Sequence, residues 1–415
     1  MIMSAIRRKD RVMKILILND YYLPGYKSGG PLRTLVNMVE RLGEEFAFFL
    51  MARDRDAGDR SPYPEIQVDA WQYLDRLCVF YASPRGKLFR KLRTGIFQTG
   101  PDLLYLNSMF SAHFTITPLC LRRLFLLPRI PVILAPRGML SPGAIELKGL
   151  KKQVFLHLAQ LLRLYHGIVW QASSEYEAED IRCIFGGGVQ IVVAPDIVAP
   201  SLLKTPQPAS SPKQIGELKL IFLSRIDRKK NLDAALMMLR EIQGNIQFHI
   251  YGPVKDQAYW EECQQIIKEL PPNIHVQYYG TVLPENVSSL FSEYALFFFP
   301  TRSENFGHVI LEALSAGCPV LISDQTPWRD LETSRAGWVV PLNQPERFRE
   351  ILKISVNMDQ QEHRIWREHA RNYAERIITN DEVLDQNRQL FYTALEYGKS
   401  NNRLRLAGFS KGECV

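Results

Sequence analysis

Short apolar runs of strand length alternate with helical patterns along almost the whole chain. Apolar residues between most of these runs recur at the spacing of an amphipathic helix, as in residues 31–42. This alternation is typical of a parallel sheet with helices on both faces, because parallel strands need a crossover between them. It therefore predicts an α/β fold. The runs of the first half are residues 14–19, 46–51, 102–107, 131–135 and 167–172.

The alternation is interrupted by residues 195–216, which hold five prolines and three serines and lack periodicity. We expect a linker there. The same alternation then resumes, and a length of 415 residues favours two domains. The prediction is two doubly wound Rossmann-like domains that face each other across a cleft. The runs of the second half are residues 218–224, 246–252, 273–280, 294–300 and 319–323.

The predicted boundaries are residues 1–200 for the first domain and residues 201–380 for the second. Residues 381–415 are expected to form a terminal helix and a disordered tail, and residues 1–12 a loose extension before the first strand. Ligands in open α/β sheets bind at the carboxyl ends of the strands. Each loop that follows a strand is therefore a candidate site.

Composition argues for a cytoplasmic protein. No run approaches the roughly 18 apolar residues that a membrane-spanning helix needs. The amino-terminal sequence lacks the apolar core and the small-residue cleavage site of a secretory signal. The six cysteines are scattered without metal-type spacing, so reduced thiols are the simplest interpretation.

The positive charge is concentrated in the first half of the chain. The net charge is +7, and residues 1–200 hold 26 Lys and Arg against 18 Asp and Glu. Such an excess suggests an anionic partner, which could be phosphate, nucleic acid or a lipid surface, although a solvated basic face gives the same composition.

Residues 85–93 carry five positive charges interrupted by Leu88, Phe89 and Leu92. If this segment is helical, its leucines share a face ringed by basic groups, which suits an anionic membrane surface. Residues 121–129 repeat the mixture, although their leucines could equally be core. We therefore expect peripheral attachment to the inner face of the cell membrane, with a soluble enzyme that has a basic rim as the alternative.

Two glutamates eight positions apart, Glu304 and Glu312, follow the run that ends at Pro300. The helix is expected to begin near Phe306 or Gly307, so that Glu304 lies in the loop before it, where free backbone N–H groups attract anions. Glu312 then lies at the edge of the buried stripe, where ligand hydroxyls could satisfy it. An acidic helix cap and a half-exposed glutamate would give the same pattern.

Arg225 and Lys230 lie five positions apart in the turn after the first strand of the second domain. A guanidinium and an ammonium group at the carboxyl end of a strand could converge on a diphosphate. An ordinary basic turn is the alternative.

The loop after the first strand of the chain contains the pair Gly29 and Gly30 but no GxGxxG, which counts against a dinucleotide-dependent dehydrogenase. Paired glycines would let the backbone approach a ligand phosphate closely, or could simply form a turn. Arg137 follows another strand and is expected at the same edge.

No metal site is predicted. Asp54 and Asp56 have the Asp-x-Asp spacing that some sugar transferases use for Mn²⁺, but they lie among arginines, and we interpret them as a surface turn. The eight histidines never pair at the spacing of a zinc site. His308 is interpreted as a residue at a helix N-terminus.

Together, these motifs resemble the large retaining glycosyltransferase family with the GT-B fold, family 4 or "glycosyltransferase group 1". The resemblance covers nearly the whole chain through the glycine-rich loop, the R-x4-K turn, and E-x7-E followed by AGCPV. Residues 19–31, 135–149 and 323–331 look like the branch that builds bacterial surface polysaccharides.

The resemblance implies a nucleoside-diphosphate sugar as donor and a glycan or lipid-linked glycan as acceptor. Glu312 would hold the ribose hydroxyls and Glu304 those of the donor sugar. Arg225 and Lys230 would neutralise the diphosphate leaving group without a metal or another cofactor. Further implied donor-binding residues are Gly29, Gly30, Phe306, Gly307 and His308.

Three departures from the family pattern stand out. Many relatives have histidine where this chain has Arg137, which leaves a catalytic or a structural role open for this arginine. Many have a histidine after the strand that ends at Asn107. The loop after residues 319–323 often has paired glycines, whereas here it reads DQTPW.

Two other classes remain as alternatives. One is a different GT-B enzyme, such as a nucleotide-sugar epimerase or an inverting transferase. The other is a non-catalytic protein that binds polysaccharide or nucleic acid, although basic and aromatic residues are not interleaved as in nucleic-acid modules. Our prediction therefore includes no nucleic-acid partner.

Overall fold

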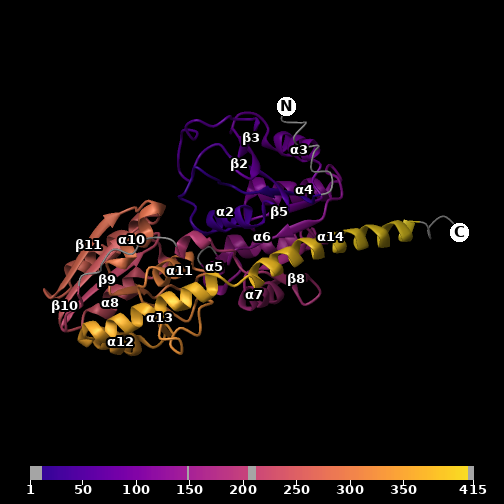
Figure 1. Ribbon diagram of the computed structural model, residues 1–415. Coiled ribbons are helices and arrows are strands. Elements are labelled where there is room, and N and C mark those ends of the chain that lie inside the picture. Colours follow the sequence, from indigo (N-terminus) through magenta and orange to yellow (C-terminus); the bar gives the residue numbers. More distant parts are fainter. Residues whose placement is uncertain (1–11, 147–148, 204–211, 410–415) are drawn as a thin grey trace. The chain divides into compact units, whose positions relative to one another are not determined.

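The computed structural model describes residues 12–146, 149–203 and 212–409 (Figure 1). The predicted extension at residues 1–12, apart from its last residue, lies outside these ranges. So do residues 204–211 of the expected linker.

The chain divides into two compact units. One consists of Met1–Val198 together with Asp381–Val415, and the other of Ala199–Asn380. The carboxyl-terminal segment is therefore part of the first unit, whereas the sequence analysis treated it as separate.

An eight-stranded sheet forms the centre of the first unit, in the order β3-β4-β2-β1-β5-β6-β7-β8. All pairs are parallel except β3 with β4, which is antiparallel. Two strands of this sheet edge, β3 and β4, were not expected from the sequence, and neither was β8. The strands are β1 (Lys14–Leu18), β2 (Ala47–Arg53), β3 (Trp71–Leu74), β4 (Leu77–Ala82), β5 (Leu103–Leu106), β6 (Val132–Leu134), β7 (Val169–Ala172) and β8 (Gln190–Val193).

Helices cover both faces of this sheet because alternate strand residues point to opposite sides. Leu16 and Leu18 of β1 join the core under α3, α4, α6 and α7, whereas Ile15 and Ile17 join the core under α2 and α14. The helices are α2 (Gly30–Leu42), α3 (Leu88–Thr99), α4 (Thr117–Arg123), α5 (Pro142–Glu146), α6 (Gly149–Leu161), α7 (Glu175–Phe185) and α14 (Glu382–Phe409).

Helix α14 lies where a terminal helix was expected and continues to Phe409. Leu390 and Phe391 are fully buried against the sheet of the first unit, and the Phe391 ring meets that of Phe46 at 5.1 Å in an edge-on arrangement. This burial explains why the terminal segment belongs to the first unit. Residues 410–415 lie outside the described residues.

The expected membrane-facing leucines of residues 85–93 are core residues instead. Leu92 in α3 is fully buried, and Leu88 packs against the core beneath the helix. The prediction was wrong because the apolar stripe of an amphipathic helix looks the same whether it covers a sheet or a lipid surface. Leu121 and Leu127 are likewise buried.

The second unit has a six-stranded, fully parallel sheet in the order β11-β10-β9-β12-β13-β14. Five of these strands match the predicted runs, and β14 was not expected. The strands are β9 (Glu217–Leu223), β10 (Asn245–Tyr251), β11 (Ile274–Gly280), β12 (Leu296–Phe299), β13 (Val320–Ser323) and β14 (Gly337–Val340).

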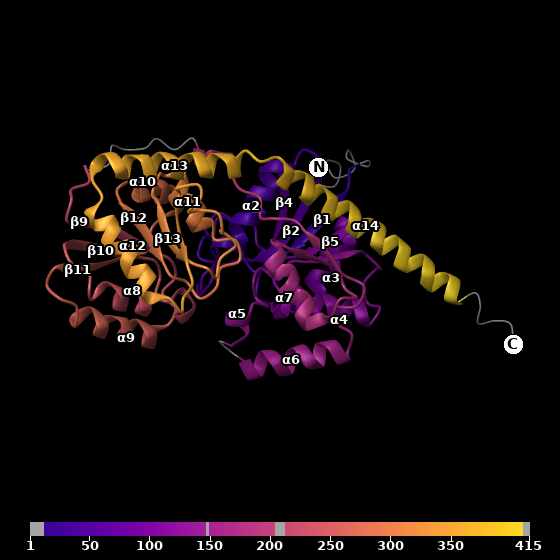
Figure 2. The same ribbon diagram turned by 90° about the horizontal axis from the view of Figure 1, so that it is seen from below.

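Figure 2 shows helices on both faces of this second sheet. One group packs together as α8, α9 and α12, and the other as α10, α11 and α13. The helices are α8 (Leu232–Leu239), α9 (Gln257–Lys268), α10 (Val287–Ser292), α11 (His308–Ser315), α12 (Pro345–Asn357) and α13 (Gln360–Ile378).

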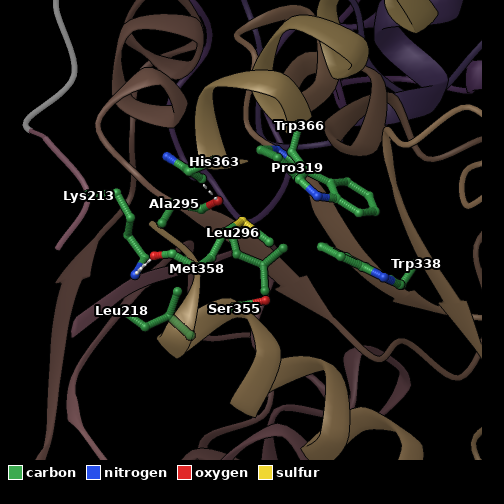
Figure 3. Close-up of a pocket in the computed structure, with 10 residues that line it drawn as sticks. All are labelled: Lys213, Leu218, Ala295, Leu296, Pro319, Trp338, Ser355, Met358, His363 and Trp366. Atoms are coloured by element: carbon green, nitrogen blue, oxygen red, sulfur yellow. Dashed lines mark hydrogen bonds between the residues drawn. The ribbon is translucent and has the colours of Figure 1, made fainter. Parts of the chain in front are cut away.

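A small cavity lies between the β9–β12–β13 region and α13 (Figure 3). Its volume of about 10 Å³ approaches that of a single water molecule, so it is a packing void rather than a ligand site. His363 contacts the carbonyl oxygen of Ala295 at 3.1 Å, and burial lowers the pKa of His363 to about 4. This histidine is therefore uncharged at neutral pH and belongs to the core.

Candidate functional site

Two loops meet at the carboxyl edge of the second sheet because β9 and β12 are neighbours. The loop after β9 contains a short 3-10 turn, Arg228–Lys230, and then Asn231 in the left-handed conformation (φ 60°). The Asn231 amide donates to the Pro300 carbonyl oxygen at 2.8 Å and accepts from Arg302 Nε at 2.8 Å. These bonds fix the loop after β9 against the loop after β12.

Lys230 and Glu304 form an ion pair at this junction. The Lys230 side chain is only 6% exposed and that of Glu304 is 19% exposed. The ammonium also lies 5.5 Å from the centre of the Phe299 ring, and the Glu304 N–H donates to the Gln325 carbonyl oxygen at 2.9 Å. The structure therefore brings together two predicted site residues from different loops.

Three cations surround the Glu304 carboxylate. Burial by itself would raise the pKa of Glu304, but the charge and hydrogen bond of Lys230, with Lys229 and Arg225, outweigh it and hold the pKa below its usual value. Burial, reinforced by the charges of Lys230 and Arg225, lowers the pKa of Lys229 to about 8. An ionised glutamate amid three basic groups leaves an excess of positive charge at this edge.

That charge excess makes the edge suitable for an anion with two phosphates. The Arg225 side chain is exposed, so a ligand can reach its guanidinium. Arg225 is also a planar donor that can contact two phosphate oxygens, whereas the lysines act as point charges.

The pKa of Lys229 leads to a test by pH. Lys229 is protonated below about pH 8 and neutral above it, so nucleoside-diphosphate affinity should fall as pH rises through 8. Calorimetric titration between pH 7 and pH 9 measures this affinity. Lys229→Met should bind more weakly at pH 7 and lose the pH step, whereas Lys229→Arg should stay tight up to pH 9. An equal pH step in Lys229→Met would contradict the interpretation.

The glutamate helix begins where the sequence predicted. Helix α11 starts at His308, after Gly307 in the left-handed conformation (φ 80°). A Cβ on Gly307 would lie 2.9 Å from Ile310 Cδ1 and 3.0 Å from Glu304 Cγ, so both the backbone angle and the packing favour glycine. Glu312, on the same helix, is 5% exposed, more buried than the edge position that we expected.

Phe306 and His308 lie beside each other, with ring centres 4.8 Å apart. Trp328 packs edge-on against Phe306 at 5.3 Å, and its indole N–H donates to the Phe306 carbonyl oxygen. The unusual DQTPW loop therefore supports the loop that carries Glu304, through Gln325 and Trp328.

In the first unit, an aspartate organises the glycine-rich loop. Asp56 Oδ2 accepts from the N–H groups of Tyr26 at 2.8 Å and Lys27 at 3.0 Å. Gly29, with φ 71°, is the N-cap of α2, which includes Gly30. A Cβ added to Gly29 would meet nothing within 4 Å, so this position needs glycine for its backbone angle and leaves open space around it.

Asp54 and Asp56 are not the surface turn that we expected. Their exposed fractions are 3% and 4%. Arg55 pairs with Asp54 at 2.7 Å, and backbone N–H groups of the glycine-rich loop donate hydrogen bonds to Asp56. Among residues 12–146, 149–203 and 212–409, no group of three His, Cys, Asp or Glu side chains is placed to hold a metal.

Arg137 is the centre of a buried polar network in the first unit. Its guanidinium pairs with Asp196, donates to Asn107 Oδ1 at 2.7 Å and to the Tyr105 hydroxyl at 2.6 Å, and is only 3% exposed. Thr34 donates to the other Asp196 oxygen at 2.9 Å. These internal bonds occupy the guanidinium, so we interpret Arg137 as a residue that holds strand ends together rather than one that touches substrate.

Sequence reasoning missed Lys229 and the role of Asp56. Lys229 looked like one more charge in a basic run, and only its half-buried position beside Lys230 singles it out. Asp56 could have been placed, because β1 and β2 are consecutive parallel strands whose carboxyl ends lie side by side. Gly25 was also missed, although a Cβ there would lie 2.3 Å from the Tyr63 hydroxyl.

None of the helices in the described part of the chain combines the length and the apolar character needed to cross a bilayer. This agrees with the absence of such a run from the sequence.

Residues 204–373, almost all of the second unit, match the model of the family described as "Glycosyl transferases group 1". Two curated relatives match parts of the chain. The GtfA subunit of a UDP-N-acetylglucosamine–peptide N-acetylglucosaminyltransferase from Streptococcus agalactiae is 25% identical over 138 residues, 32% of this chain and 26% of that protein. An uncharacterized 41.2 kDa protein in the cps region of Klebsiella pneumoniae is 24% identical over 230 residues, 54% of this chain and 60% of that protein. The matched segments thus span about a quarter and three fifths of these relatives.

Solved structures resemble the chain over nearly its full length. Sucrose-phosphate synthase from Thermosynechococcus elongatus aligns with a TM-score of 0.66 and 16% identity, covering 95% of this chain and 100% of that one. Anabaena HepE in complex with UDP-glucose aligns with a TM-score of 0.65 and 17% identity, covering 92% and 99%. These likenesses confirm the predicted fold class, which is α/β and of the GT-B type with two Rossmann-like domains.

Proposed function

We propose that the chain is a retaining, metal-independent glycosyltransferase. It moves a sugar from a nucleoside-diphosphate sugar to a hydroxyl group of a glycan or lipid-linked glycan, in the synthesis of a surface polysaccharide. The Lys230–Glu304 pair, set among Arg225 and Lys229 at the carboxyl edge of the second sheet, carries this proposal.

The reaction itself explains why such a cluster is useful. Breaking the anomeric C–O bond develops negative charge on the departing diphosphate and positive charge on the sugar. Preorganised cations stabilise the leaving group in the transition state. Arg225, Lys229 and Lys230 supply that charge, while Glu304 holds Lys230 in position and offers a carboxylate oxygen to donor hydroxyls.

The comparisons support the general part of the proposal, that the chain is a glycosyltransferase. The family model covers the segment that contains all the cluster residues. HepE was crystallised with UDP-glucose, which makes a UDP-sugar the first donor to test. The relative in a cps region points towards a polysaccharide acceptor.

The metal-independent part of the proposal has a direct test. Cations take the place of Mn²⁺ at the leaving group, and Asp54 and Asp56 are occupied by Arg55 and by backbone N–H groups. Excess EDTA should therefore leave at least about half of the sugar-transfer rate, since no metal has to neutralise the diphosphate. Complete loss of the rate, restored by Mn²⁺, would show that a metal takes part.

The assignment as a whole is tested by thermal shift and donor cleavage. UDP and GDP should raise the melting temperature, because a ligand that binds only the folded state stabilises it. Slow hydrolysis of the matching nucleotide sugar should follow, and analysis of the anomeric configuration of the transferred sugar tests retention. No shift with any nucleoside diphosphate would contradict the proposal, as would isomerisation of the donor in place of its cleavage.

A further inference from the structure

We propose that the exposed face of β10 and β11 in the second unit binds a neutral oligosaccharide segment by stacking a sugar ring on Tyr279. The inference rests on the proposed function only in that a glycan acceptor would supply such a segment. The residues of this face are not among those of the candidate functional site.

One face of the second sheet meets water at its β11 end, where β11 is the edge strand and β10 its neighbour (Figure 1). Successive residues of a strand point to opposite faces. On one face, Ile246, Phe248 and Ile250 of β10 are fully buried. Parallel strands are normally covered on both faces, so polar residues exposed on the other face suggest a ligand. These exposed residues are Asn245, Gln247, His275 and Gln277.

A change of register between β10 and β11 adds a tyrosine to this face. Ile250 pairs with Tyr278, but Tyr251 pairs with Gly280, so Tyr279 is an extra residue in β11. Such a bulge redirects a side chain, and bulges are frequent at sheet edges and beside functional sites. Tyr279 is 45% exposed, which is unusual for so large an aromatic side chain and makes its ring available to a ligand.

The Tyr279 ring is stacked flat on the ring of Tyr251, with centres 4.9 Å apart and planes 9° apart. Tyr251 covers one face of the Tyr279 ring, so the opposite face is the one that meets water. The Tyr251 hydroxyl is hydrogen-bonded to that of Tyr294 at 2.9 Å, and the Tyr294 hydroxyl to His249 Nδ1 at 2.9 Å. Both supporting tyrosines are buried. The ring that a ligand would contact is therefore fixed in advance, which lowers the entropic cost of binding.

An aromatic ring with amide groups beside it matches the two kinds of surface on a sugar. The C–H groups on the face of a sugar ring pack against the electron-rich face of an aromatic ring. The hydroxyl groups at the rim of the sugar donate and accept hydrogen bonds, as side-chain amides also do. Gln277 Oε1 accepts from the Tyr279 hydroxyl at 2.8 Å, so its amide nitrogen lies beside the ring and can donate to a sugar hydroxyl.

The charge of this face favours a neutral ligand over nucleic acid, whose bases also stack on aromatic rings. The Lys219 ammonium lies 4.6 Å from the centre of the Tyr294 ring and pairs with Glu293 at 3.5 Å. Burial, with the charge of Lys219, lowers the pKa of His249, so this imidazole is uncharged at neutral pH. Nucleic-acid binding depends on an excess of positive charge, which these groups do not supply.

The stacked tyrosines lie at the strand ends next to the loop that carries Arg225. The Ser224 N–H donates to the Tyr251 carbonyl oxygen at 3.0 Å, and the Gly252 N–H donates to that of Gly280 at 2.7 Å. These bonds hold the carboxyl ends of β9, β10 and β11 side by side, and Arg225 follows Ser224 directly. A glycan bound to the tyrosine stack would therefore lie at the same edge of the sheet as the proposed diphosphate site.

Tyr279→Ala tests the inference by native electrophoresis in gels that contain dextran, galactomannan or mixed-linkage β-glucan. At least one of these neutral polysaccharides should retard the wild type. Tyr279→Ala should weaken that binding about tenfold, because it removes the stacking contact and the apolar area that the sugar covers. Tyr279→Phe keeps the ring and should bind within about threefold of the wild type. Tyr392→Ala, which removes a 51% exposed tyrosine from the first unit, is the matched control and should bind like the wild type.

The hydrogen-bonding contribution is tested by Gln277→Ala, which keeps the tyrosine stack. This variant should bind the same polysaccharide about three- to tenfold more weakly, the usual effect of one lost hydrogen bond. Melting temperatures of both alanine variants should stay close to that of the wild type, because both side chains are exposed.

A comparison with UDP separates this inference from the proposed function. Polysaccharide binding is measured without donor, and the thermal shift that UDP causes should be the same in Tyr279→Ala as in the wild type. A wild type that UDP stabilises but that no polysaccharide retards would refute this surface and leave the glycosyltransferase proposal intact.

Other results would also overturn the inference. Equal retardation of the wild type and Tyr279→Ala would show that the polysaccharide binds elsewhere. Tighter binding of a single-stranded RNA that displaces the polysaccharide would assign the surface to nucleic acid. A dimer in sedimentation velocity that Tyr279→Ala dissociates would assign it to a second copy of the chain, joined through the edge of β11.

Discussion

Replacing Lys230 with alanine is expected to lower the turnover of sugar transfer roughly 100- to 1,000-fold, the usual cost of losing one preorganised contact to a developing charge. Lys230 is buried beside Glu304, so its ammonium is fixed before the diphosphate departs and needs no rearrangement. Arg225→Ala should have an effect of similar size. The measurement is the initial rate of product formation at saturating donor.

Arg228→Ala is the matched control for Lys230→Ala. Arg228 belongs to the same turn but pairs with Glu262 and lies over the Tyr259 ring, and it is not among the cations that lower the pKa of Glu304. Its removal should change the rate less than about threefold, as expected for an exposed ion pair. Thermal melts of all variants separate loss of chemistry from loss of fold. Rates near wild type in both Lys230→Ala and Arg225→Ala would show that this cluster does not stabilise the leaving group.

Replacing Arg137 with methionine is expected to lower the stability of the first unit by about 3–5 kcal/mol. The change leaves the Asp196 carboxylate, which is 4% exposed, buried without its cation. It also removes the donors to Asn107 and to the Tyr105 hydroxyl. Hydrogen exchange of peptides from β5 and β6 measures the effect locally, which matters because a chain with two units need not unfold in one step.

The double variant Arg137→Met with Asp196→Asn distinguishes the lost ion pair from lost packing. The double variant also lacks the buried charge of Asp196, so it should regain part of the stability that Arg137→Met loses. Such recovery is expected when both partners of a buried pair are neutralised. Nucleoside-diphosphate affinity should stay within about threefold of wild type in Arg137→Met, since no contact of Arg137 with the ligand is expected. If stability is unchanged but turnover collapses, Arg137 is a catalytic residue and our interpretation fails.

The sequence determined the architecture because the signals for it are local. Parallel strands buried on both faces must be continuous apolar runs, and the helices between them must carry an apolar stripe. Both patterns can be recognised in the sequence. Three of the strands that were not expected, β3, β8 and β14, have only four residues each, a pattern too short to stand out, whereas the six-residue β4 was simply overlooked. The loops that carry Arg225 and Glu304 could also be singled out as candidates, because ligands in open α/β sheets bind at the carboxyl ends of the strands.

Which charged groups are paired was decided by tertiary structure alone. Nothing in the spacing shows that Lys230 reaches Glu304, seventy-four positions away, or that Arg137 is occupied by Asp196, because partners distant in sequence are set by strand order. Tertiary structure also decided which apolar residues are buried. Leu92 and Phe125 both lie among arginines in the sequence, yet one is fully buried and the other 70% exposed, since the packing of α3 and α4 on the sheet determines which side of each segment meets water.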